Sequence, residues 1–419
     1  MANPIAVPGT VVPASSGVSP GGAQGLTGPV QVSADTGNIA QLGSDGLVLV
    51  PQSQIWSVRL RSYNSLAWGN PNFEIDQANV GTVLTNPASG TRLVDRWFVG
   101  RSAGLTGTVN TQKAAIAFGS GIVVPGTSYA ITQGALNVVV GTAQASLAAG
   151  DYWYFFQNVE GPMMRELQQD VHSLTLLVKS SVAGLKFSVS LRDNPNTYTL
   201  VKLCTIPSAN TYTLITLPSL PIWTASSSNW SVAPGTIGYQ IGICLASGTT
   251  LTTATTDVWT AGNYIAASGM SNLLATAGAS FTAALIQHEP GGICSQLMDL
   301  DFDTNLWRCL RYLDKSYDYA IKPGTINDNG RVSFWAAGAT TAGIAPVTFS
   351  RRMAKVPTIT IYNPVTGAVN SVRDGNVTDH GSATGATWTG EHGMNRVDFA
   401  TATTGATQIY AHYVADTGW

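Results

Sequence analysis

The sequence predicts an all-β fold, and three features of the chain support that prediction. Apolar residues alternate with polar ones along many short runs, which is the period of a strand with one buried face. Turn-forming residues separate these runs, and the chain holds 44 glycines and 20 prolines. Only 11% of the residues are charged, against about 25% in an average soluble domain, whereas a helical bundle is rich in Glu, Lys and Arg. Many short strands between such turns are typical of a sandwich or a barrel.

The first segment, over residues 1–45, is predicted to be an extended arm. Prolines and glycines crowd residues 1–34, and these residue types block helices and interior strands. Large apolar residues are too few there to build a hydrophobic core. The segment is therefore either a flexible linker or an arm that becomes ordered on a partner.

Strand-like alternation begins near residue 46. In the clearest run, Leu185, Phe187 and Val189 share one face and polar residues take the other. Such one-sided alternation is typical of antiparallel sheets with one dry face and one wet face. Further runs of this kind cover residues 174–178, 237–244, 358–361 and 409–413. We expect a first β domain over residues 46–303 and a smaller one over residues 322–419.

Residues 304–315 break this pattern and predict a helix of about three turns. Leu306, Leu310 and Leu313 recur at helical spacing. Asp303 or Thr304 can cap the first turn. We expect this helix to pack on the first β domain and to connect it, within residues 304–321, to the second.

Charge is scarce overall and missing from long stretches. The 21 basic and 23 acidic residues give a net charge of -2, so the chain lacks the basic surface that neutralises nucleic-acid phosphates. Residues 114–150 carry no charge, and Asp257 is the only formal charge in residues 203–288. Polar residues interrupt these stretches, so we expect no membrane insertion, and without a signal peptide we expect synthesis in the cytoplasm. Uncharged surface of this kind suits contacts with other subunits or with a neutral glycan.

No catalytic motif stands out, so we expect a protein that is not an enzyme and that uses no cofactor or metal. His288 and Glu289 could form half of an acid–base site, but a structural carboxylate at a strand end is the preferred interpretation. Asp299, Asp301 and Asp303 alternate as oxygen ligands for Ca²⁺ can, although the glycine and glutamate of an EF-hand loop are missing. Cation binding by this acidic cluster stays open.

Four tryptophans are candidate carbohydrate-binding residues. Two of them flank a polar loop, and the other two lie among threonines. An indole offers a flat apolar face to the C–H groups of a sugar, and neighbouring hydroxyls can meet its OH groups. The alternative is that each tryptophan caps the core at a strand end. The candidates are Trp223, Trp230, Trp259 and Trp388.

Short motifs also occur in a fixed order along the chain. An N-x-x-F-x-x-x-Q element covers residues 70–77 and precedes D-R-W at residues 95–97. A Q-x-E-x-G element covers residues 287–291, and C-x-R-Y-x-x-K-S begins at Cys309. Further matches lie at residues 33–38, 43–47 and 352–360. Together these motifs resemble those of bacteriophage tail-fibre or minor virion structural proteins that contain a carbohydrate-binding-module-like jelly roll.

Two positions depart from the pattern of that family. Leu313 stands where the family often has a tyrosine, and Arg352 precedes Met353 instead of following a methionine. These changes leave the implied fold intact. They do not bear on sugar specificity, which depends on loops outside the motifs.

The resemblance implies a virion appendage with four parts. These are an N-terminal extended arm (1–45), a jelly-roll β-sandwich (46–303), a short connecting helix (304–321) and a smaller C-terminal β-sandwich (322–419). It implies attachment to other virion proteins through residues 1–45, a homo-oligomer expected to be a trimer, and non-catalytic contact with host surface polysaccharide. One alternative is a head-fibre or particle-decorating adaptor whose jelly roll packs only on other virion subunits. The other is a glycan depolymerase.

Overall fold

The computed structural model describes residues 41–42, 48–49, 69–115, 121–127, 130–131, 134–167, 171–221, 230–297, 300–337, 340–385 and 388–419. Strands dominate these residues and the helices are short, which confirms the predicted all-β fold. Most of the predicted arm lies outside the described residues. Its described part is β1 (Gln41–Leu42), which pairs antiparallel with β2 (Val48–Leu49).

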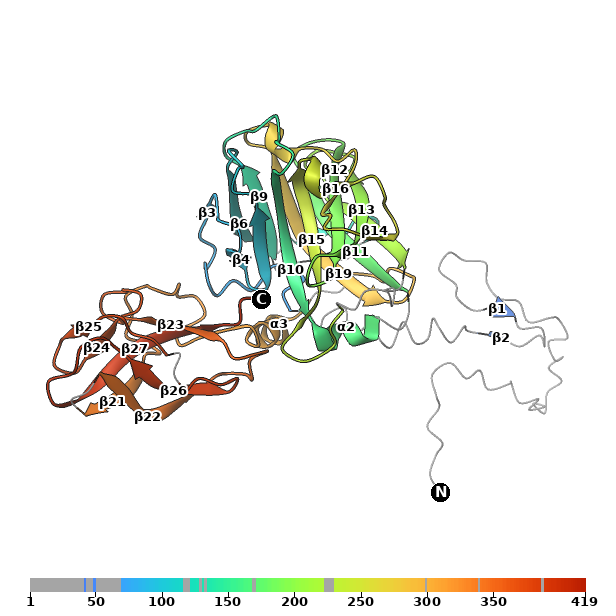
Figure 1. Ribbon diagram of the computed structural model, residues 1–419. Helices are drawn as coiled ribbons and strands as arrows, with labels where there is room; N and C mark the ends of the chain where they lie inside the picture. Colours follow the sequence, from blue (N-terminus) through green and yellow to red (C-terminus); the bar gives the residue numbers. More distant parts are fainter. Residues whose placement is uncertain are drawn as a thin grey trace, which may run out of the picture.

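Two antiparallel sheets form the larger domain (Figure 1). The first has the order β17 (Trp259–Ala261), β13 (Tyr198–Ile206), β12 (Leu185–Arg192), β15 (Ile237–Ser247), β10 (Tyr152–Glu160), β5 (Trp97–Arg101) and β4 (Arg92–Val94). The second has the order β14 (Thr213–Leu220), β11 (His172–Ser180), β19 (Ser280–Pro290), β9 (Gly134–Val140), β6 (Val109–Ala115) and β3 (Leu84–Thr85). Smaller elements are β7 (Ile122–Val123), β8 (Ala130–Ile131), β16 (Thr252–Thr253), β18 (Ala266–Ala267), α2 (Gly161–Leu167) and the 3₁₀ turns Thr249–Leu251 and Leu273–Ala275.

The strand pairing of this domain is nested. β12 pairs with β13, β11 with β14, β10 with β15 and β9 with β19, so four antiparallel pairs enclose one another. Successive pairs lie in alternate sheets. A long double strand wrapped in this way is a jelly roll, the sandwich that the motifs had implied. Residues from both sheets, such as Phe155 on β10 and Phe281 on β19, meet in one hydrophobic core.

The connecting helix is shorter than predicted. α3 covers Phe302–Cys309, and the Asp301 side chain caps it by accepting a hydrogen bond from the Thr304 amide at 2.9 Å. Leu313, expected to be the last helical leucine, instead lies in β20 (Leu313–Lys315). β20 pairs with residues 414–416, and Leu313 is buried there. The prediction of a three-turn helix over 304–315 was therefore wrong, because sheet pairing outweighs a weak helical preference.

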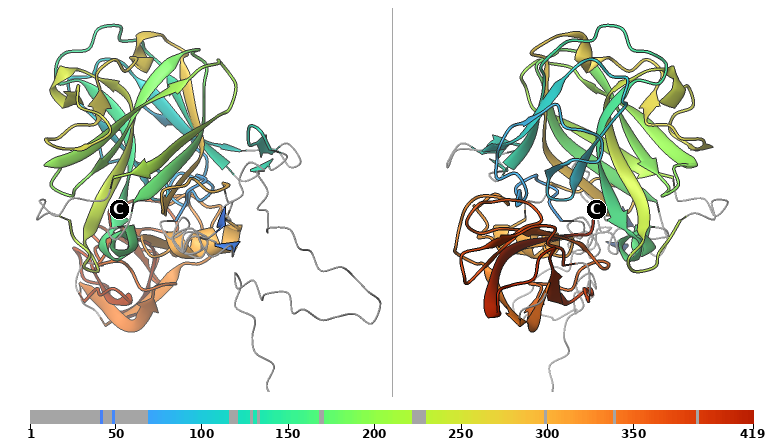
Figure 2. Two further views of the ribbon diagram at one scale, coloured as in Figure 1. Left: turned by 90° about the vertical axis from the view of Figure 1, so that its right-hand side faces the viewer. Right: turned by 60° about the vertical axis from the view of Figure 1, so that its left-hand side comes forward.

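The C-terminal domain is organised around β27 (Ala406–Asp416), and it lies at one end of the jelly roll in both views of Figure 2. β21 (Val332–Ala337) pairs with the first half of β27, and β23 (Thr358–Tyr362) pairs with the second half. The remaining strands are β22 (Thr341–Thr348), β24 (Val372–Asp374), β25 (Asp379–His380) and β26 (Gly393–Asp398). The domain has its own core, with Ile361, Val397 and Ile409 fully buried. Because β20 belongs to this sheet, its strand pairing begins before the expected boundary at residue 322.

A buried carboxylate joins the two domains. Glu160, at the end of β10, is 1% exposed and accepts hydrogen bonds from Arg311 at 2.6 and 2.8 Å and from the Tyr312 hydroxyl at 3.0 Å. The Arg96 guanidinium lies 3.5 Å from the centre of the Tyr312 ring. Burial raises the pKa of Glu160, but the bonds from Arg311 and Tyr312 outweigh it and hold that pKa below its usual value. The carboxylate therefore stays charged and binds the segment after α3 to the jelly roll.

Amide side chains extend this junction. The Asn70 side chain accepts a hydrogen bond from the Ile75 backbone amide at 2.8 Å, and the Asn70 backbone amide donates to the side-chain oxygen of Asn305 in α3 at 2.6 Å. Gln77 donates to Asp95 at 2.7 Å and to the Leu313 carbonyl at 3.1 Å. All of these residues are buried. The residues at positions 70–77, 95–97 and 309–317 that carry the family resemblance thus meet at the joint between the domains.

Removing one partner of the buried carboxylate tests this junction. Arg311→Met is expected to lower the free energy of unfolding by about 3 kcal/mol, because Glu160 loses its ionic partner while buried. Arg352→Met is the matched control, since the Arg352–Glu391 pair lies at the surface and should contribute about 0.5 kcal/mol or less. Denaturant unfolding followed by tryptophan fluorescence measures both. Equal, small losses in the two variants would contradict the role given to Glu160.

Candidate functional site

A row of aromatic rings crosses the outer face of the first jelly-roll sheet. Trp153 and Phe155 of β10 point into the core, so the alternate residues of that strand point outward. The Tyr154 and Phe156 rings stack with centres 5.3 Å apart, and Phe98 of β5 stacks on Phe156 at 5.9 Å. The outer-face strip consists of Tyr152, Tyr154, Phe156 and Phe98.

Glycines on the two neighbouring strands make room for this strip. A Cβ atom on Gly100 of β5 would lie 2.1 Å from the Tyr154 ring. A Cβ atom on Gly242 of β15 would lie 2.8 Å from the Ser190 hydroxyl and 3.3 Å from the Tyr154 ring. Both glycines pair with residues of β10. The Tyr154 ring therefore lies low against the sheet, between two positions where a side chain would displace it.

Polar side chains border the strip on one side. Arg192 donates to the Tyr154 hydroxyl at 3.0 Å and to Asn263 at 2.7 Å, and it also bonds to Gln240. Gln240 in turn donates to Asn158 at 3.0 Å. Burial raises the pKa of Tyr154, so its hydroxyl stays protonated at neutral pH. Tyr154 and Arg192 are themselves buried, whereas Phe156, Asn158 and Gln240 beside them are half-buried. This half-buried ring and these amides can meet both the C–H face and the OH groups of a sugar.

An uncharged groove of about 350 Å³ lies at one end of the strip. Met270, which lines it, packs on the same small hydrophobic cluster as Tyr152 and Phe156. Leu147 also lines it, and the other lining residues are small or carry hydroxyls: Ala149, Ser247, Gly248, Thr249, Thr252, Ala267 and Gly269. The strip and the groove therefore lie next to each other on the outer face of the sheet.

The four predicted tryptophans lie in different surroundings. Trp223 lies outside the described residues. Trp230 and Trp259 meet edge to face at 5.3 Å, and Trp259 is only 9% exposed and donates from its indole to the Pro221 carbonyl at 3.1 Å. That burial places Trp259 with the core, as in the alternative interpretation. Trp388 is 69% exposed and belongs to the C-terminal domain.

The outer-face strip was not among the residues predicted from the sequence. The feature of the sequence that could have indicated it is the run of five aromatic residues from Tyr152 to Phe156, which a strand must divide between its two faces. Which rings point outward, and their contact with Phe98, depends on how β10 pairs with β5.

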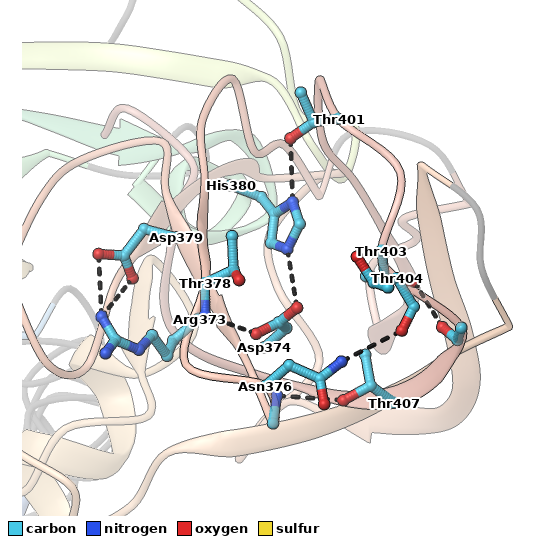
Figure 3. A network of polar contacts seen from close by, with 12 residues as sticks. Arg373, Asp374, Asn376, Thr378, Asp379, His380, Thr401, Thr403, Thr404 and Thr407 are labelled. Atoms are coloured by element: carbon cyan, nitrogen blue, oxygen red, sulfur yellow. Dashed lines mark hydrogen bonds and ion pairs between the residues drawn. The ribbon is translucent and has the colours of Figure 1, made fainter.

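A second polar cluster lies in the C-terminal domain (Figure 3). His380 contacts the Thr401 hydroxyl at 3.0 Å and an Asp374 oxygen at 3.2 Å, and Asp374 accepts from the Thr378 amide at 2.7 Å. The order of hydroxyl, imidazole and carboxylate is that of a nucleophilic triad. His380 and Asp374 are however only 2% and 3% exposed, so the cluster acts as a brace between the β24–β25 hairpin and the loop at Thr401.

The acidic cluster considered for Ca²⁺ does not form a site in the described part of the chain. Asp299 lies outside the described residues, and Asp301 is used as the cap of α3. Among the described residues, no three His, Cys, Asp or Glu side chains come together in an arrangement that could hold a metal ion. Asp303 lies in the first turn of α3, where its charge favours the helix dipole.

His288 and Glu289 point to opposite faces of β19 and do not form an acid–base pair. Glu289 accepts two hydrogen bonds of 2.6 Å from Ser295, which confirms its structural role. His288 contacts the Tyr239 hydroxyl at 2.8 Å and His172 at 2.6 Å, and His172 reaches the Pro221 carbonyl at 3.1 Å. This chain of buried polar contacts crosses the core from β15 in one sheet to β19 in the other.

Comparisons with known proteins add only distant likenesses. No family model and no curated protein matches the chain. A family 11 carbohydrate-binding module from Clostridium thermocellum, solved with a β-1,3-1,4-mixed-linked tetrasaccharide, is 12% identical over 50% of this chain and 98% of its own, with a TM-score of 0.25. A family 61 carbohydrate-binding module solved with β-1,4-galactotriose is 11% identical over 46% of this chain and 88% of its own, with a TM-score of 0.22.

A phage protein is among the same distant likenesses. The enzymatically active domain of tailspike protein 4 of bacteriophage CBA120 is 12% identical over 50% of this chain and 21% of its own, with a TM-score of 0.24. Likenesses with such TM-scores carry no inference about function, which therefore depends on the residues of the site. In the described part of the chain, no helix has the length and apolar character needed to span a membrane.

The buried histidine pair predicts a loss of stability in acid. Burial lowers the pKa of His172 to about 4, against its usual value of 6.5 in the unfolded chain. The unfolded state therefore binds the proton more readily, and unfolding is favoured as the pH falls from 6.5 towards 4. At pH 5 this single group should lower the free energy of unfolding by about 2 kcal/mol relative to pH 7.

Denaturant unfolding at the two pH values measures this loss. His172→Gln is the matched variant, because it removes the titrating group and should show a smaller decrease between pH 7 and pH 5. An identical decrease in both proteins would show that His172 plays no part in the acid response.

Proposed function

We propose that this chain is a structural protein of a phage virion, a tail-fibre or appendage subunit that contacts host surface glycan without cleaving it. The observation that carries the glycan contact is the outer-face strip, a row of stacked rings beside amide and guanidinium groups. The virion role is proposed from the order of the sequence motifs. Residues 1–45 are proposed to attach the subunit to other virion proteins, in a homotrimer.

The chemistry of the strip favours a neutral sugar as ligand. Phe156 is half-buried, so part of its ring can stack on the C–H face of a pyranose. Asn158 and Gln240, also half-buried, are hydrogen-bonded to each other and offer a planar donor and acceptor beside that ring. The neutral groove at the end of the strip can take the next sugar of an oligosaccharide.

The same residues argue against cleavage. Glycoside hydrolysis uses two carboxyl groups about 5 to 10 Å apart on either side of the scissile bond. The polar side chains beside Tyr154 and Phe156 are amides and a guanidinium: Asn158, Arg192, Gln240 and Asn263. At the Phe98 end, the carboxylate of Asp416 is paired with Arg92, which lies over the Phe98 ring. The amides and the guanidinium bind a sugar but do not supply the acid and the base of a hydrolase.

Glycan binding by the full chain tests the proposal. Binding is measured on an array of neutral oligosaccharides and on surface polysaccharide purified from candidate hosts. Phe156→Ala is expected to weaken the affinity at least tenfold, which corresponds to ~1.4 kcal/mol, because the stacking face is lost. Trp307→Ala is the matched control, since Trp307 is an aromatic residue 53% exposed on α3, away from the strip.

Three other outcomes of this experiment are informative. Equal binding by both variants would exclude the outer-face strip as the site. Binding to no glycan, with the protein still incorporated into particles, would favour a head-fibre or adaptor subunit. Release of new reducing ends from a polysaccharide would identify a depolymerase.

The arm is tested by truncation. Deleting residues 1–34 should leave a folded protein, because the two described hydrophobic cores begin after the arm, but it should abolish incorporation into particles. Circular dichroism checks the fold, and immunoblotting of purified particles checks incorporation. Normal incorporation of the truncated chain would overturn the attachment role.

A further inference from the structure

Two exposed tryptophans lie on the C-terminal domain, away from the outer-face strip. Trp335 on β21 is 45% exposed, and Trp388, in the turn before β26, is 69% exposed. Burying a large aromatic side chain normally stabilises a protein, and the fold forgoes much of that gain at both positions.

Strand register places Trp335 near Arg396. Trp335 of β21 pairs with Gly343 of β22, and Gly343 pairs with Arg396 of β26. Paired residues of neighbouring strands point to the same face of a sheet, and neighbouring strands lie about 4.8 Å apart. Trp335 and Arg396 therefore project from one face about 10 Å apart, with a residue that has no side chain between them.

Arg396 connects this face to the second tryptophan. Its guanidinium lies 5.4 Å from the centre of the Trp388 ring, within the range of a cation–π contact. Its Nε atom also donates to Asp398 at 2.6 Å. The arginine is thus held by two neighbours, and its charge is balanced by Asp398.

The opposite side of Trp335 carries a similar group. Trp335 pairs with Gln408 of β27, which accepts a hydrogen bond from the Tyr410 hydroxyl at 2.7 Å. Arg331 lies 4.2 Å from the centre of the Tyr410 ring and pairs with Asp328. Arg331 and Arg396 therefore each lie over a ring and have a carboxylate partner, and Arg373, which pairs with Tyr410 in the sheet, is ion-paired with Asp379. The face thus carries planar polar groups whose charges are balanced.

The backbone of Trp388 is the second, independent observation. Its φ of 60° lies in the left-handed region, which is less favourable for a residue with a side chain than for glycine. A bulky aromatic residue is rare in that conformation, and such strain concentrates at functional sites. Neither burial nor backbone preference explains a tryptophan there, whereas presentation of its ring to a ligand does.

We propose that this face of the C-terminal domain, named here the Trp335–Trp388 face, is a second carbohydrate-binding site. A neutral oligosaccharide stacks on the two indoles, and its hydroxyls bond to Arg396, Asp398 and Gln408 between and beside them. The balanced charges favour a neutral glycan over a charged polymer. The inference rests on the proposed function, since it gives the same protein a second point of contact with host glycan.

Trp388→Gly is the decisive variant. Glycine favours the left-handed backbone at this position, so the thermal midpoint should stay unchanged or rise. Affinity of the full chain for a neutral oligosaccharide that binds the wild type should fall at least tenfold. Trp307→Ala is the matched control, because Trp307 is also exposed and also has an arginine, Arg351, 5.3 Å from its ring centre.

The outcomes distinguish the two proposals. Loss of binding in Trp388→Gly and Trp335→Ala but not in Phe156→Ala would support this face and overturn the outer-face strip. Loss in Phe156→Ala alone would overturn the Trp335–Trp388 face and leave the proposed function standing. A change of oligomeric state in Trp388→Gly, seen by sedimentation, would assign the face to a second copy of the chain and overturn the inference.

Discussion

The architecture depends on one buried carboxylate. Glu160 is the last residue of β10, the strand that carries most of the outer-face strip. Its carboxylate accepts hydrogen bonds from Arg311 and Tyr312, which lie in the segment leading to the C-terminal domain. A buried charge is tolerated only when it is paired and hydrogen-bonded, so these three residues must come together. The result is a fixed joint: the strand that presents the strip and the chain leading to the second domain are held by the same bonds.

The position of the few charged residues is related to this joint between the domains. Several of the charged residues are used inside it, among them Arg92, Asp95, Arg96, Glu160 and Lys315, all of them buried. The groove near Met270, on the outer surface of the jelly roll, is lined by small, apolar and hydroxyl-bearing residues without charge. Charged groups thus help to hold the domains together, and this uncharged surface suits contact with a glycan or another subunit.

The family motifs take on a structural meaning in the same place. Across the junction, Asn70 bonds to Asn305, Gln77 to the Leu313 carbonyl and Arg311 to Glu160, so segments far apart in the sequence are joined there. In this chain, three of the motifs lie at the joint between the two β domains. They do not coincide with the outer-face strip or with the Trp335–Trp388 face, and so a resemblance based on them indicates the architecture more directly than the ligand.

Local pattern determined much of this protein. Alternation over residues 185–192 and 237–244 predicted strands that the structure contains, because a side-chain period of two is a property of the chain itself. The extent of α3 was decided by tertiary structure, since Leu313 gains a strand partner only after β27 is in place. The tertiary structure likewise decided which residues make up the two proposed binding faces. Whether Trp259 is buried or Trp388 exposed, and which rings of β10 point outward, depends on the register of strands distant in sequence, which no local pattern contains.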